Sequence, residues 1–323
     1  MKKISIIAAL STGLFAHHGV PTVSVAGLVG PGAPIETTSS TTLQEGSLLG
    51  YMRVDSASYT TYTPAKDGEQ QRSDFFLYGA GYGVTSYFSA YIFAPYYTKA
   101  QDDALTTSDF HDLNFQLTLG MKYDDGLMLM PKSESLDDLE DWHFTATFSF
   151  TLPTGNSNLT DANGVLLDAG MQTSFGEPSY MFGVSATKWF GNDWTIVGDV
   201  SYNTFMEHTY SDGSTMHFGD EIRANAAVTY MLYSEASKLF RCDFNMEANY
   251  LSIGRDIVNG TAATATGGKI LYLTPGTRIY YKHTSLALGL KLPTATQLNE
   301  EALQQGAEGK EDYRFIFTFS TLF

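Results

Sequence analysis

Features that mark disulfide-rich, nucleic-acid-binding and helical membrane proteins are scarce in this chain. Its 323 residues include one cysteine, Cys242, which excludes a disulfide framework and lies far from any N-terminal lipid-anchor position. Only 17% of the residues are charged, and the net charge of -16 argues against nucleic-acid binding. After residue 16, no apolar run approaches the ~20 residues that a membrane-spanning helix requires.

Aromatic residues, in contrast, are abundant. Phenylalanine, tyrosine and tryptophan make up 14% of the chain, and the mean hydropathy of -0.13 is close to neutral. A transmembrane barrel has this balance because each strand turns one face to lipid and the other to a polar lumen. The composition therefore favours a single exported β domain.

The N-terminus has the pattern of a secretory signal peptide. Two lysines follow Met1, residues 4–15 are apolar, and Ala16 provides a small residue at the cleavage point. The predicted signal peptide is therefore 1–16, with cleavage after Ala26 as a second option. Either cleavage site implies export.

The last eleven residues, 313–323, alternate between two kinds of side chain. One parity carries Tyr313, Phe315, Phe317, Phe319 and Phe323, and the other carries Arg314, Thr318 and Ser320. Such an aromatic face would be a sticky edge in a soluble protein, but in a closed membrane barrel it meets lipid. The segment also resembles the C-terminal assembly signal of bacterial outer-membrane barrels, so we expect the barrel-assembly machinery to be a partner.

The same alternation recurs along the chain and predicts about twelve strands. They are 47–59, 74–83, 86–97, 112–123, 142–153, 179–190, 194–205, 220–232, 239–252, 269–280, 284–293 and 313–323. Most reach the length of about 9–11 residues with which a tilted strand crosses a bilayer. A two-sheet sandwich has the same period, but broad aromatic faces opposite faces with charge pairs favour a barrel.

The connections alternate in length, which sets the orientation. Long connections near 60–73, 98–111, 154–178, 206–219, 253–268 and 294–312 alternate with short turns. Outer-membrane barrels have long extracellular loops, short periplasmic turns and periplasmic termini. The long acidic connector 124–141 breaks the rule, either as an insertion or through an error in the predicted strands. We therefore predict an all-β, antiparallel, up-and-down transmembrane β-barrel over 47–323 in the bacterial outer membrane, in contact with its lipid.

Three short motifs carry a family resemblance. They are residues 30–40 (GPGAPIETTSS), Tyr82-Gly83-Val84-Thr85 and Leu152-Pro153-Thr154-Gly155. Together they resemble the outer-membrane "MetA-pathway of phenol degradation" family across nearly the whole mature chain. The resemblance implies a barrel of transporter type.

The polar faces of the strands predict the side chains that line the lumen. These are Arg53, Asp55, Lys122, His143, Asp199, Glu221, Arg223, Arg241, Asp243, Glu247, Arg278 and Lys291. The mixture of signs predicts no strong ion selectivity, and both a structural ion-pair network and a solute-lining role remain open. Tyr78, Tyr82, Tyr87 and Tyr91 are candidates for stacking on a solute if they face inward. Twelve strands predict a narrow or plugged lumen.

Residues 17–46 form a predicted extended arm, rich in Gly, Pro, Ser and Thr, with only two acidic residues. The arm is a candidate plug, and a disordered leader is the alternative. A free N-terminal His17 beside His18 offers nitrogen ligands for a copper ion. No other cofactor is expected.

We find no specific catalytic constellation and expect no enzyme. The spacing of His143 and Thr145 resembles that of barrel phospholipases, but threonine replaces serine and both side chains face the lumen. We therefore expect a channel that passes or takes up small solutes, hydrophobic or aromatic ones among them. The alternatives are a structural or sensory barrel with a blocked lumen and binding loops and, behind it, a lipid-modifying enzyme.

Overall fold

The structure is a computed structural model that describes residues 32–59, 70–101, 105–132, 141–191, 193–299 and 311–323. The predicted signal peptide, His17 and His18 lie outside these residues. Within the described part, no helix is long and apolar enough to cross a membrane.

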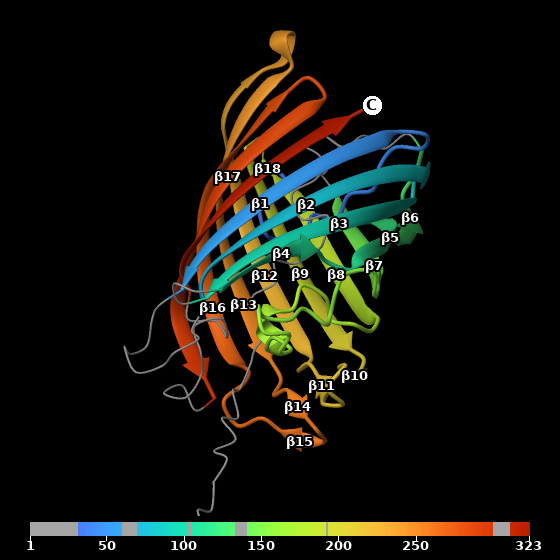
Figure 1. Cartoon of the computed structure of the whole chain (residues 1–323). Coiled ribbons are helices and arrows are strands. Elements are labelled where there is room, and N and C mark those ends of the chain that lie inside the picture. Colours follow the sequence, from blue (N-terminus) through green and yellow to red (C-terminus); the bar gives the residue numbers. More distant parts are fainter. Residues whose placement is uncertain (1–31, 60–69, 102–104, 133–140, 192, 300–310) are drawn as a thin grey trace, which may run out of the picture.

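The chain forms a closed antiparallel barrel (Figure 1). The strands of its wall are β1 (Leu48–Tyr59), β2 (Gln70–Thr85), β3 (Phe88–Gln101), β4 (Leu105–Phe110), β5 (Leu113–Tyr123), β6 (Leu127–Leu129), β7 (Trp142–Leu152), β8 (Ser179–Phe190), β9 (Trp194–Phe205), β12 (Glu221–Glu235), β13 (Phe240–Ile253), β16 (Gly268–Tyr281), β17 (Thr284–Leu298) and β18 (Glu311–Leu322). Of the 14 strands in this sheet, β4 continues β5 along one wall position and β6 is a short hairpin partner of β5, which leaves the twelve crossings predicted from sequence.

The two terminal strands close the barrel. β1 pairs with β18 from Leu49↔Leu322 to Tyr59↔Glu311. The backbone N–H groups of Leu48 and Phe323 also donate to each other's carbonyl oxygens, at 3.1 and 2.7 Å. Closure leaves no unpaired edge in lipid, where an unsatisfied backbone group is costly.

The outer face is apolar and carries aromatic groups at both ends. Near the short turns, Trp194 contacts Tyr230 with ring centroids 4.6 Å apart. Near the long loops, Tyr96 meets Phe110 at 5.2 Å. Such girdles mark the two interfaces of a membrane barrel.

Several strands are longer at the long-loop end than predicted. β3 and β4 continue as a hairpin into the predicted connection 98–111, and β17 runs to Leu298. The sequence does not predict these extensions, because strands outside the bilayer need no apolar face and therefore show no clear alternation. The acidic connector begins with a tight hairpin onto β6, and its residues 133–140 lie outside the description.

Three long loops fold over the long-loop end of the barrel. A second small sheet orders β10 (His208–Thr209), β11 (Thr215–His217), β14 (Ile257–Val258) and β15 (Thr261–Ala262). Beside it lie the 3-10 turn η1 (Ala169–Met171) and a cluster of buried side chains that includes Phe175, Phe205 and Phe218. At the other end, η2 (Ala236–Lys238) forms a short turn.

Candidate functional site

The candidate site is the lumen and the chain segment inside it. The predicted lumen residues Arg53, Asp55, Lys122, His143, Asp199, Glu221, Arg223, Asp243, Glu247, Arg278 and Lys291 are all buried, and Arg241 is half-buried. They occupy the polar parity of strands whose other parity faces outward, so the structure brings them together inside the barrel. Whether they contact a passing solute stays a prediction.

Charged neighbours on one strand face neutralise each other. Because residues i and i+2 share a face, Arg53 pairs with Asp55 at 2.6 Å and Arg223 with Glu221 at 2.7 Å. Arg241 and Asp243 form the same arrangement at 2.6 Å. Burial of a charge is tolerable only with such partners. The R-x-D and E-x-R spacings are visible in the sequence and could have identified these pairs.

The N-terminal arm, defined here as residues 32–46, fills the half of the lumen next to the short turns. Residues 32–43 are buried except Thr38, which is half-buried. The backbone N–H of Gly32 donates to Asp243 Oδ2 at 2.9 Å, and that of Leu43 donates to Ser89 Oγ at 2.9 Å. Asp243 and Ser89 both lie near short turns, so both ends of this segment are close to that end of the barrel.

The middle of the arm reaches charged side chains that lie halfway along the wall. The Glu36 carboxylate pairs with Arg53, and Lys291 Nζ lies 2.7 Å from Glu36 Oε2. Burial alone would raise the pKa of the Glu36 carboxyl, but the charges of Arg53 and Lys291 outweigh burial and hold that pKa well below 4.5. This acidic residue therefore links the arm to β1 and β17 as an anion.

Backbone groups of the arm are satisfied by wall side chains. The Glu247 carboxylate accepts from the N–H groups of Ile35 at 2.5 Å and Thr37 at 2.8 Å, and Asp199 Oδ2 accepts from Thr38 N–H at 2.7 Å. Arg278 donates to the carbonyl oxygens of Ala33 and Pro34. The sequence predicted these wall residues but not that the arm would be their partner.

Two apolar side chains anchor the arm. Ile35 packs against Ala287 and Ile316, next to Gly276 and Gly289. Leu43 joins an inward-facing cluster on β1–β3 with Tyr51, Leu77, Tyr91 and Phe93, among others. The inner face of β1–β3 is therefore apolar, which is why parity alone could not orient these strands.

Of the four tyrosines that are candidates for stacking on a solute, two do not face inward. Tyr78 and Tyr82 lie on the outer face with exposed fractions of 46% and 49%. The inner parity of β2 carries glycines instead, because a Cβ at Gly83 would lie 1.9 Å from the carbonyl oxygen of Gln44 in the arm. Tyr87 is half-buried in the β2–β3 turn, and Tyr91 faces inward.

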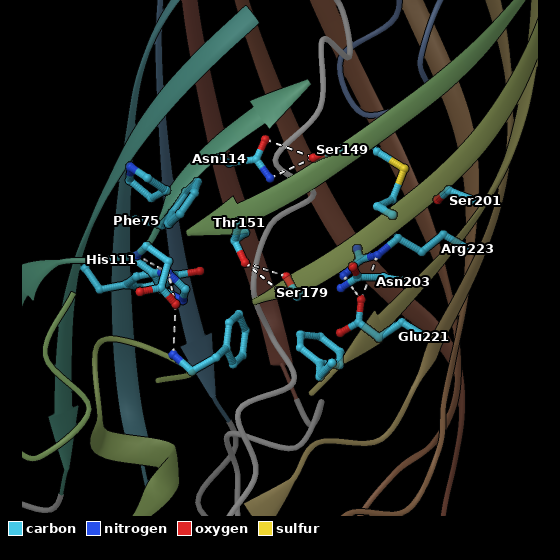
Figure 2. Close-up of a pocket in the computed structure, with 16 residues that line it drawn as sticks. Phe75, His111, Asn114, Ser149, Thr151, Ser179, Ser201, Asn203, Glu221 and Arg223 are labelled. Carbon is cyan, nitrogen blue, oxygen red and sulfur yellow. Dashed lines mark hydrogen bonds and ion pairs between the residues drawn. The ribbon is translucent and has the colours of Figure 1, made fainter. Parts of the chain in front are cut away.

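A cavity occupies the half of the barrel next to the long loops (Figure 2). We call it the outer cavity; its volume is about 70 Å³, and it is lined by Phe75, Pro95, Tyr97, His111, Asp112, Asn114, Ser149, Thr151, Phe175, Ser179, Met181, Ser201, Asn203, Phe205, Glu221 and Arg223. A smaller cavity of about 20 Å³ shares Met181 and Ser201 with it and reaches Thr38 of the arm. The two cavities are therefore neighbours, and the smaller one borders the arm.

The enzyme-like pair His143 and Thr145 is buried inside the wall. Thr145 Oγ1 lies 2.6 Å from Ser185 Oγ, and His143 Nδ1 lies 3.0 Å from the carbonyl oxygen of Asp141. Both side chains are 1% exposed, on the parity opposite to the lipid-facing one. In addition, no three His, Cys, Asp or Glu side chains of the described residues gather as a candidate metal site.

Comparison with solved structures identifies the fold. The COG4313 outer membrane channel from Pseudomonas putida F1 matches with a TM-score of 0.68 and 13% identity, over 90% of this chain and all of that one (100%). The NanC porin matches at 0.44 with 10% identity (84% of this chain, 98% of that one), and the translocator domain of the autotransporter NalP from Neisseria meningitidis at 0.44 with 10% identity (87% and 89%). The fold is that of a bacterial outer-membrane β-barrel.

Sequence comparison adds no family. No protein-family model matches the chain, and no curated protein matches it. The resemblance to the phenol-degradation family is therefore not confirmed, whereas the outer-membrane β-barrel that it implied agrees with the fold.

Proposed function

We propose that this protein is an outer-membrane channel for small solutes, hydrophobic or aromatic ones among them, and that the arm is its gate. Passage would occur by diffusion and weak binding, from the outer cavity past the arm to the periplasm. The observation that carries the proposal is the division of the lumen into a lined cavity and a plug held mainly by polar contacts. Water can replace such contacts, so the plug can leave without unfolding the wall.

The charge pattern supports a path for uncharged solutes. Most inward charges are paired along their own strand or with Glu36, so the lumen offers no ring of one sign to select ions. The aromatic side chains of the outer cavity instead offer contact area to apolar groups.

Flux through liposomes tests the proposal. The full-length mature protein and a variant without residues 17–45 would be folded into liposomes, and entry of a small aromatic solute would be followed. We expect the deletion to increase entry. If the deletion variant, shown to be folded by circular dichroism, gives neither entry nor conductance, the channel function is wrong.

A barrel with a blocked lumen and binding loops is the second candidate. The cluster in which Phe175 and Phe218 of the loops pack with Phe205 at the end of β9 favours it, because loops with a packed core present a defined outer surface. Absence of flux from both proteins in the same assay would support this candidate.

A further inference from the structure

Five aromatic rings form a continuous arc along one side of the outer cavity. Phe75 and Tyr97 lie 4.7 Å apart between ring centroids, Tyr97 and His111 5.3 Å. His111 and Phe175 follow at 4.8 Å, and Phe175 and Phe205 at 4.7 Å. The rings come from β2, β3, the break between β4 and β5, a long loop and β9. The tertiary fold thus gathers aromatic contact surface from five separate segments.

The polar side chains opposite the arc mostly satisfy one another (Figure 2). Asn114 Nδ2 donates to Ser149 Oγ at 2.7 Å, and Thr151 Oγ1 lies 2.9 Å from Ser179 Oγ. Arg223 is held by Glu221. An anionic solute would therefore have to compete with an existing ion pair.

Two polar side chains on β9 are different. Ser201 and Asn203 line the cavity, and neither side chain has a hydrogen-bond partner among the described residues. Both are half-buried, and they share the inward parity of β9 with Phe205. Residues two apart on a strand are separated by about 7 Å, so one strand presents an open polar group next to an aromatic one.

We infer that the outer cavity is a binding site for small uncharged aromatic molecules that carry one hydrogen-bonding substituent. The ring lies against the arc, and the substituent meets Asn203 and Ser201. A plain hydrocarbon binds less well because it displaces water from Asn203 without replacing the hydrogen bond. The inference rests on the proposed function, since it assigns this cavity as the site at which a solute enters the path.

Equilibrium binding to the folded, full-length protein in detergent tests the inference. Benzyl alcohol, toluene and benzoate share one ring and differ in the substituent. We expect benzyl alcohol to bind most tightly. Asn203→Leu should weaken benzyl alcohol binding about three- to tenfold, the effect of one lost hydrogen bond, without weakening toluene binding. Ser201→Ala, which removes only a hydroxyl, gives a second variant that should fold.

The matched control is Thr204→Val, on the outer parity of the same strand, which should leave all three affinities unchanged. Equal affinities for the three probes, or equal losses in the Asn203 and Thr204 variants, would overturn the assignment. Liposome flux separates this failure from failure of the channel. Flux without a binding preference refutes only the cavity assignment, whereas a preference without flux in the arm deletion refutes only the channel.

Discussion

At the scale of single residues, Glu36 is the only acidic residue of the buried arm segment 32–43. Glu36→Gln removes the anion that pairs with Arg53 and Lys291 and leaves two buried cations without that partner. Breaking a buried pair in this way typically costs about 3–5 kcal/mol, and here the loss weakens the docking of the arm. We expect faster hydrogen exchange at the arm amides. The control is Glu45→Gln, an exposed acid of the same arm; equal exchange in both variants would refute the role of Glu36.

Acid should release the arm through the same carboxyl. Because the pKa of Glu36 is held well below 4.5 in the folded protein, its stabilising effect is complete above about pH 4.5 and is lost as the pH falls through the folded value. We expect the arm amides to be better protected in the wild-type protein than in Glu36→Gln by a constant factor above about pH 5, and we expect this factor to fall below pH 4.5. Comparing the two proteins at each pH removes the intrinsic pH dependence of exchange and the titration of other groups. A factor that does not fall in acid would refute the role of the Glu36 carboxyl.

Lumen residues differ in how well the sequence predicts them. Alternation placed Asp243 and Glu247 on the inner face because the outer parity of their strand is clearly apolar. Tyr78 was not predictable, because β2 is apolar on both faces: one meets lipid and the other meets Tyr91, Phe93 and the arm.

At the scale of elements, the arm depends on a pocket for Ile35. A Cβ at Gly289 would lie 3.0 Å from Ile35 Cγ2, so Gly289→Val should displace Ile35 while valine suits the strand. We expect increased solute entry into liposomes. Gly198→Val is the matched control, because the nearest atom to its Cβ is 3.6 Å away, and it should not change entry. Increased entry in neither variant would show that Ile35 does not hold the arm.

The closing strand β18 gives a separate prediction about which of its faces meets lipid. Phe317 faces outward and is half-buried, whereas Thr318 faces inward and is 1% exposed. Phe317→Arg should destabilise the folded barrel by about 2–4 kcal/mol near the middle of the bilayer, and Thr318→Ser should have a small effect. Denaturant titration in lipid vesicles measures both. Similar free energies of unfolding would mean that the two faces are assigned wrongly.

The sequence predicted the wall better than its contents. The alternation of apolar and polar side chains predicted the ends of most strands to within two residues, as for Ser179–Phe190 and Trp194–Phe205. It could do so because the lipid requires one apolar face on each strand. The aromatic arc was not predicted. It depends on Phe175 in a long loop and on His111 at a strand break, and neither position belongs to a periodic pattern.

At the scale of the whole molecule, a closed wall surrounds a segment that is held by a different set of contacts. The wall is held by continuous backbone ladders from β1 around to β18, while the buried arm segment 32–43 is attached through side chains. Opening therefore requires breaking the second set of contacts only. On the proposed function, this separation would let the arm act as a gate while the sheet stays closed.

A reversible disulfide between the arm and the wall is the decisive test of the arm as a gate. Ser40 Oγ and Ser185 Oγ lie 2.8 Å apart, so Ser40→Cys with Ser185→Cys, in a Cys242→Ser background, places two thiols within bonding reach. Solute entry into liposomes would be measured after oxidation and again after reduction. If the arm is the gate, oxidation reduces entry to the level of protein-free liposomes and reduction restores it. Equal entry in the oxidised protein and in the variant without residues 17–45 would contradict it.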